Sequence, residues 1–208
     1  MRALTCPNCN ALSGFVSQEC PRCGASLGVH LPSRSLVVAH PDGIEIDGRR
    51  WVRCANWHDM GCNWVTPAEL GVGEEGVRGR CFAGSLIRVY PDTDDTVALD
   101  KLHSATVNLR MLVYQLAELG LPIEPFWRTE GGLAFDLTSS ITTGKPVVIG
   151  HANGVVTIDL AETMDAYRER LRVRLGEPYR TMLGHFRHEV GHYYQNVLIE
   201  NGEGAARY

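Results

Sequence analysis

The sequence has no long apolar run, no strong excess of charge and no low-complexity tract. None of its 208 residues belongs to a run of roughly 18 apolar side chains, the length that a membrane-spanning helix needs. The first residues, MRALTCPNCN, lead straight into a cysteine motif and lack the apolar core of a signal peptide. A net charge of −4 argues against a surface that binds nucleic acid along the whole chain. We therefore expect a cytoplasmic globular protein that is neither membrane-spanning, secreted nor disordered.

The residue type that stands out in this sequence is cysteine. There are seven, an odd number, and four of them form two close C-x-x-C pairs. Without an export signal, this pattern favours metal ligation in a reducing compartment over disulfides. Changes in composition along the chain predict three parts: a zinc ribbon over residues 1–30, a β-rich cysteine-containing module over 31–98, and a domain of mixed helices and strands over 99–208.

The first four cysteines have the spacing of a four-thiolate zinc site. Two tight turns, Cys-Pro-Asn-Cys and Cys-Pro-Arg-Cys, each present a pair of sulfurs, and one zinc ion completes the tetrahedron. Four protein ligands leave no open position, so such a zinc is structural. The alternative is four buried thiols without metal. The predicted ligands are Cys6, Cys9, Cys20 and Cys23.

The other three cysteines, Cys54, Cys62 and Cys81, are one ligand short of a closed zinc site. His58 lies between the first two and would complete a three-cysteine, one-histidine set. The alternative is three small buried side chains, because free cysteine packs well in a core. The sequence leaves both possibilities open for this second structural zinc.

Periodicity predicts an α+β fold for the rest of the chain. Leu109, Leu112, Val113, Leu116 and Leu119 follow the spacing of one helix face, and Gly120 marks its end. Strands are expected over 132–137 and 147–160, the second interrupted by an Asn-Gly hairpin signal at 153–154. Two further helices are expected, over 163–175 and from residue 178 to about 202.

The last of these helices carries the motif His188-Glu189-Val-Gly-His192. Histidines four residues apart lie on one helix face and can bind a single catalytic zinc ion. The glutamate can act as general base on a water molecule. At about 100° per residue, the histidines fall on a different face from the large apolar side chains, which are Tyr179, Met182, Leu183, Phe186, Val190, Tyr193 and Val197.

A third protein ligand is harder to find. In the extended form of the motif, a glycine and a histidine would stand where this chain has Gln195 and Leu198. Glu200 lies roughly 12 Å along the helix axis from the second histidine, and Glu203 reaches back only if the chain reverses. Neither is assigned, and His185, on the histidine face, is expected to be solvated.

These motifs together resemble the bacterial zinc-binding metallopeptidases that carry an N-terminal zinc ribbon. The resemblance covers nearly the whole chain and rests on CPNC and CPRCG, CANWHDMGCNWVTPAE, RVYPD, GGLAFDL, TIDLAE and above all GEPYRTMLGHFRHEVGHYYQ. It implies a zincin-like domain over 99–208 with a short antiparallel sheet and an active-site helix. It also implies His188 and His192 as zinc ligands and Glu189 as the catalytic base.

Two departures from the family pattern matter. Members have C-x-x-C where this chain has Cys81-Phe-Ala-Gly84. Members also continue further, with acidic residues downstream of the helix, so the zincin-like domain is expected to be incomplete at its C-terminus and to lack the third ligand.

The sequence therefore predicts a zinc-dependent metallopeptidase that acts on a peptide or protein. The alternative is a catalytically inactive zinc-ribbon interaction module that keeps the peptidase-like helix as scaffold. Nucleic-acid binding is not expected, because Arg22 is the only basic residue between the first and last ribbon cysteines. No membrane partner is expected, and the oligomeric state is left open.

Overall fold

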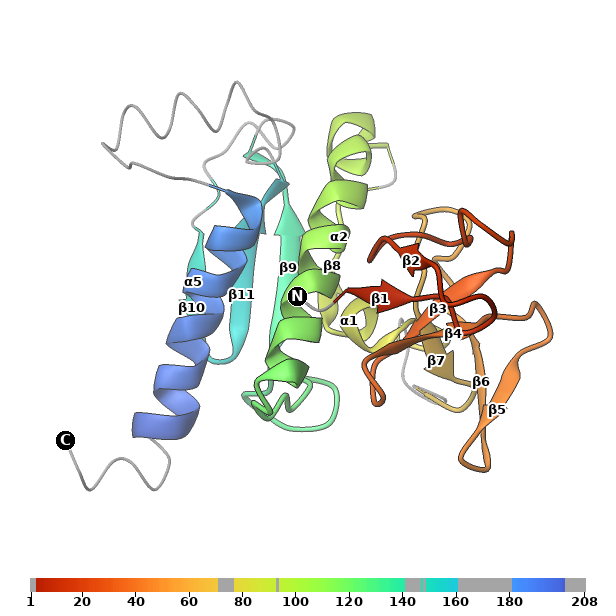
Figure 1. The fold of residues 1–208 in the computed structure, drawn as a ribbon. Helices are drawn as coiled ribbons and strands as arrows, with labels where there is room; N and C mark the ends of the chain where they lie inside the picture. Colours follow the sequence, from red (N-terminus) through yellow and green to blue (C-terminus); the bar gives the residue numbers. More distant parts are fainter. Residues whose placement is uncertain are drawn as a thin grey trace. The chain divides into compact units, whose positions relative to one another are not determined.

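The chain folds into two compact units, seen here in a computed structural model that describes residues 3–70, 77–92, 94–140, 147, 149–160 and 181–200. The first unit comprises Met1–Ser85 and Val113–Pro122, and the second comprises Leu86–Leu112 and Ile123–Tyr208. Helices and short sheets are mixed (Figure 1), which confirms the α+β class. The segments predicted as ribbon and cysteine module share the first unit, and the predicted boundaries at residues 30 and 98 stay a prediction.

The first unit consists mainly of short antiparallel β-sheets. Two are hairpins, one has three strands, and the short helix α1 follows them in the sequence. The elements are β1 (Leu4–Thr5) with β2 (Leu12–Ser13), β3 (Leu27–His30) with β4 (Ser35–Val38), β5 (Ile44–Ile46) with β6 (Arg49–Arg53) and β7 (Val65–Pro67), and α1 (Phe82–Ser85).

Buried polar contacts join the ribbon segment to the cysteine module. The side-chain amide of Asn63, which is fully buried, donates to the carbonyl oxygens of Phe15 at 2.7 Å and Ser17 at 3.2 Å. The Gln18 amide donates to the Trp57 carbonyl at 2.7 Å. Trp57 also belongs to the apolar core of the module, so the ribbon segment is hydrogen-bonded to a residue of that core.

The second unit contains one four-stranded sheet in the order β10–β11–β9–β8 (Figure 1). Its strands are β8 (Ile87–Val89), β9 (Ala134–Thr138), β10 (Gly150–Ala152) and β11 (Val155–Asp159). The predicted hairpin is confirmed: β10 and β11 are antiparallel, and Asn153 and Gly154 between them have φ of 49° and 82°, as this tight turn requires. The other two pairs are parallel, so the sheet is mixed.

The long helix α2 (Thr96–Glu118) lies between β8 and β9 in the sequence and supplies the crossover that parallel strands need. Asp95 caps it, because its carboxylate accepts the Ala98 N–H at 2.7 Å. The predicted apolar face is buried except at Leu119, which is 72% exposed. That part of the prediction was wrong because the helix ends at Glu118, before the turn at Gly120, where φ is 69°.

Helix α5 (Met182–Tyr194) contacts β10 and β11 and continues as a π-helical segment, η2 (Gln195–Glu200). The Thr181 hydroxyl caps α5 by accepting the Gly184 N–H at 3.1 Å. The helix predicted over 163–175 and the expected start at residue 178 lie outside the described residues. Among the residues that are described, no helix is both long enough and apolar enough to cross a membrane.

Candidate metal centres

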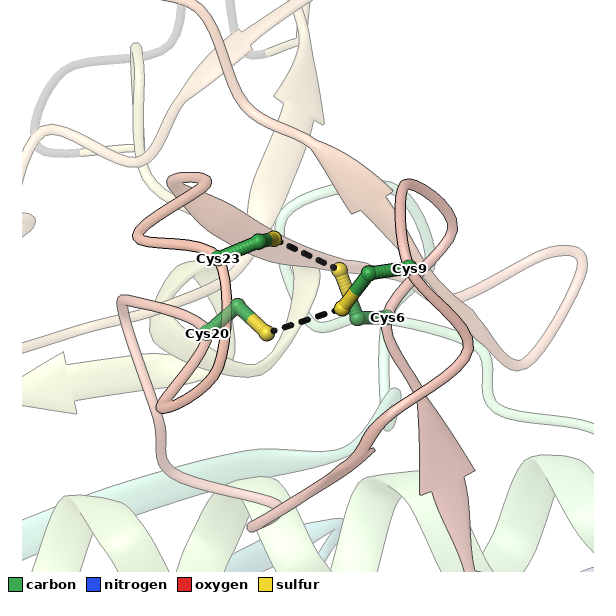
Figure 2. Close-up of side chains that lie close together, drawn as sticks. All are labelled: Cys6, Cys9, Cys20 and Cys23. Atoms are coloured by element: carbon green, nitrogen blue, oxygen red, sulfur yellow. Dashed lines mark hydrogen bonds between the residues drawn. The ribbon is translucent and has the colours of Figure 1, made fainter.

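The four ribbon cysteines converge on one point (Figure 2). Their sulfur atoms all lie within 4.8 Å of one another, with Cys6 Sγ 3.7 Å from Cys23 Sγ and Cys9 Sγ 3.6 Å from Cys20 Sγ. A tetrahedral zinc ion with Zn–S bonds of about 2.3 Å separates its sulfurs by about 3.8 Å. The observed spacing therefore fits a zinc ion and is far too long for a disulfide.

The two turns that carry these cysteines have the same backbone geometry. In each, the first cysteine N–H donates to the alanine carbonyl five residues on, at 2.9 Å, and its carbonyl accepts the N–H four residues on. The residue after the second cysteine is left-handed in both turns, Asn10 at φ 57° and Gly24 at φ 68°. Asparagine and glycine adopt this conformation most readily, which explains the residue after each C-x-x-C pair.

Electrostatics in the ribbon favour a thiolate. The backbone N–H of Cys23 is the main cause that lowers the pKa of Cys20, from 9.0 to about 6. A sulfur that accepts such hydrogen bonds loses its proton more readily, so less free energy is needed to form the thiolate that binds a cation at neutral pH.

The second cysteine cluster is also assembled, although its members come from three separate segments. Cys54 follows β6, Cys62 precedes β7, and Cys81 precedes α1; all three are buried, with sulfurs within 4.8 Å of one another. The Cys81 N–H donates to Cys54 Sγ at 3.1 Å. Hydrogen bonds from Cys62 and Cys81 hold the pKa of Cys54 well below its usual range, while hydrogen bonds with Cys54 and Cys62, followed by burial, raise the pKa of Cys81. The buried cluster therefore favours a thiolate at Cys54.

Gly84, where the family resemblance implies a fourth cysteine, lies beside this cluster. Its N–H donates to Cys81 Sγ at 3.4 Å, and a Cβ built on Gly84 would lie 3.6 Å from the same sulfur in ordinary contact. His58, the predicted fourth ligand, is exposed and is not among the side chains that converge here. The structure thus brings together three of the four predicted residues.

The two motif histidines on α5 also converge. His188 and His192 are exposed, and their Nε2 atoms lie 3.3 Å apart. Two imidazoles bound to one tetrahedral zinc at about 2.05 Å place their nitrogens about 3.3 Å apart. The opposite face of α5 packs inward through Met182, Phe186, Val190, Tyr193 and Tyr194. The pair is therefore spaced to bind one zinc ion.

A pocket of about 470 Å³ adjoins this pair, and Glu189, His192 and His151 line it. His151, on β10, is half-buried; burial is the main cause that lowers its pKa, and the nearby His192 lowers it further. His185, which was expected to be solvated, is half-buried.

No third ligand is assembled within the part of the chain that the structure describes. There, no further histidine, cysteine, aspartate or glutamate places a ligand atom within 4.8 Å of both motif histidines. The helix continues as η2 through Glu200. The side chain of Glu200 and the whole of Glu203 lie outside the described residues.

Comparisons with known families agree with this arrangement. Residues 98–208 match the family described as "Putative zinc-binding metallo-peptidase", and residues 3–95 match a zinc-ribbon domain. The chain belongs to this metallopeptidase family. The family and the cysteine clusters together support zinc binding by the chain.

Relatives of this family member occur in mycobacteria. Uncharacterized proteins from Mycobacterium bovis and Mycobacterium tuberculosis are each 41% identical over 206 residues, which is 96% of this chain and 54% of the relative. The chain thus spans about half the length of the curated relatives it matches. No solved structure matches it.

His151 is a histidine of this pocket that sequence reasoning did not identify. The available signal was its position two residues before the Asn-Gly turn, in a strand expected beside the motif helix. Only the register of β10 against β11 brings this ring to the pocket.

Proposed function

We propose that this chain is a zinc-dependent metallopeptidase that hydrolyses peptide bonds. The observation that carries the proposal is the 3.3 Å approach of His188 Nε2 and His192 Nε2 on an exposed helix face beside a pocket. These two residues would hold the catalytic zinc. When bound, zinc polarises a carbonyl group and lowers the pKa of water.

Glu189 is the proposed general base. Neighbouring side chains on a helix point in directions about 100° apart. The Glu189 carboxylate therefore points in a different direction from the His188 ring. It lines the same pocket as His192. There it accepts a proton from the attacking water and delivers that proton to the leaving amine.

The proposed substrate is an extended peptide segment. Among the described strands, β10 lies at the edge of the sheet and pairs only with β11. It also contacts α5, so a peptide that adds to this edge by backbone hydrogen bonds would run alongside the pocket.

The cysteine clusters have a structural role in this proposal. Four thiolates close the ribbon site, so its zinc replaces the apolar core that this short segment lacks. The Cys54, Cys62 and Cys81 cluster would hold a second structural zinc. Both need reduced thiols, which supports a cytoplasmic location.

The test is Glu189→Gln, assayed on an internally quenched peptide library with zinc measured in the same samples. We expect zinc content to stay unchanged and hydrolysis to fall about 10²- to 10⁴-fold, the usual contribution of a general base. Glu45→Gln, an exposed change on β5, is the matched control and should behave as wild type.

Full activity in Glu189→Gln would contradict the mechanism. A wild-type chain that holds zinc on α5 but cleaves no peptide would favour the alternative, an inactive interaction module.

A further inference from the structure

His151 lies between two adjoining pockets. On one side is the pocket of about 470 Å³ that Glu189 and His192 also line. On the other is a pocket of about 460 Å³ whose lining includes Tyr193 and Asn153. A molecule that occupies either pocket therefore meets the His151 ring.

The orientation of this ring is set by the hairpin turn and by α5. The Gly154 N–H donates to His151 Nε2 at 3.1 Å, and the Tyr193 ring packs edge-to-face with centroids 6.0 Å apart. A ring nitrogen that accepts a hydrogen bond carries no proton, so the neutral ring carries its hydrogen on Nδ1. Among the described residues Nδ1 has no hydrogen-bond partner. The ring therefore presents an unused donor in a half-buried position.

The turn that holds the ring is itself held in place. The Gly154 carbonyl accepts the Ala134 N–H from β9 at 2.9 Å. A Cβ on Gly154 would lie 2.2 Å from the Gly131 oxygen, so two backbone segments meet here without space between them. Preorganised donors of this kind stabilise developing charge well because they need not reorient during the reaction.

The two tyrosines of α5 do not offer an alternative donor. Tyr193 and Tyr194 are 3% and 8% exposed, and neither is among the residues that line the pocket shared by Glu189 and His192. His151 lines the pocket together with the proposed base, and it does so from the hairpin turn that holds its ring, whereas the amide donors of the lining, Gln195 and Asn196, lie on η2.

We propose that His151 contacts the substrate and donates its Nδ1–H to the carbonyl oxygen of the peptide bond under attack. This inference rests on the proposed hydrolysis, and it adds a residue to that reaction: Glu189 accepts the proton of water on one side of the carbonyl, while His151 stabilises the oxygen on which negative charge develops.

Two substitutions separate this role from a merely structural one. In His151→Asn the amide nitrogen stands near the position of Nδ1, so the donor is retained and the contact with Gly154 is lost. In His151→Gln the side-chain oxygen reaches the Gly154 N–H, so the turn contact is retained and the donor is lost. A structural role predicts that the glutamine variant works and the asparagine variant fails; the proposed role predicts the reverse.

We would measure two quantities for wild type and both variants, each loaded with zinc to the same content. The first is hydrolysis of the best-cleaved quenched peptide: kcat should fall about 100-fold in His151→Gln, the usual cost of losing such a donor, with KM little changed, and should stay near wild type in His151→Asn. The second is acetohydroxamate binding by calorimetry, where Kd should rise about tenfold in His151→Gln alone, as expected for one lost hydrogen bond.

The two readouts distinguish failure of the inference from failure of the proposed function. Equal hydroxamate affinity in all three proteins, or activity that survives in His151→Gln but not in His151→Asn, would overturn the inference. Hydroxamate binding that depends on His151 in a chain without hydrolysis would support the contact and contradict the peptidase activity.

Discussion

Gly154→Ala tests whether the hairpin turn beside the pocket is as tightly held as the structure indicates. The residue has φ of 82°, and the added Cβ would lie 2.2 Å from the Gly131 oxygen and 2.5 Å from the Gly132 oxygen. Gly131→Ala is the matched control, because Gly131 has a similar φ of 73° in the same unit but open space where its Cβ would stand. The control isolates the backbone cost and leaves out the clash.

The expected magnitudes follow from these two terms. A left-handed alanine costs about 1–2 kcal/mol, which is all that Gly131→Ala should lose. Overpacking against backbone adds about 1–3 kcal/mol, so Gly154→Ala should lose about 2–5 kcal/mol in total. At about 2–4 °C per kcal/mol for a chain of this size, thermal unfolding followed by circular dichroism resolves the two variants.

Equal losses of stability in the two variants would refute the reasoning, since the close approach of the two backbones would then cost nothing. We also expect Gly154→Ala to weaken peptide hydrolysis more than Gly131→Ala does. The reason is that the Gly154 N–H holds the His151 ring.

Three further changes test other parts of the molecule. A zinc chelator should remove zinc from the ribbon and unfold that segment, which contains no tryptophan, so the loss is followed as a lower urea midpoint by circular dichroism. An unaltered urea midpoint in the chelated chain would contradict a structural role for the metal. Gly84→Cys should slow the release of zinc from the Cys54 cluster, because the new Cβ lies 3.6 Å from Cys81 Sγ. Gly84→Ala is the control and should not slow it. Equal rates of zinc release from both variants would argue against a fourth ligand position there. Asn63→Ala should lower the free energy of unfolding by about 1–3 kcal/mol, because it leaves the Phe15 and Ser17 carbonyl oxygens without their buried donor. An unchanged urea midpoint would show that these contacts do not hold the ribbon to the module.

Local features of the fold were predictable from the sequence because short-range chemistry determines them. Asn153-Gly154 forms the hairpin because both positions need positive φ, and the C-x-x-C turns form because each is followed by a residue that tolerates the left-handed conformation. The apolar face of α5 was likewise read from helical periodicity, and Met182, Phe186 and Val190 are buried on it.

Features that depend on distant segments were not predictable in the same way. The parallel pairing of β9 with β8 depends on a crossover through α2, and β9 also pairs in parallel with β11; periodicity reveals neither pairing. Leu119 fits the helical spacing, but the helix stops one residue before it. His58 has the spacing of a ligand, yet Cys54, Cys62 and Cys81 meet without it because they come together from three segments.

The most direct test of the central claim is the zinc content of the purified chain, measured by elemental analysis on wild type and the His188→Ala/His192→Ala double variant. His185→Ala, on the same helix, is the control. We predict that the double variant loses one zinc ion per chain, because its two ligand nitrogens, 3.3 Å apart in the wild type, are gone, while the control keeps the wild-type content. The same zinc content in all three proteins would contradict a catalytic zinc site on α5.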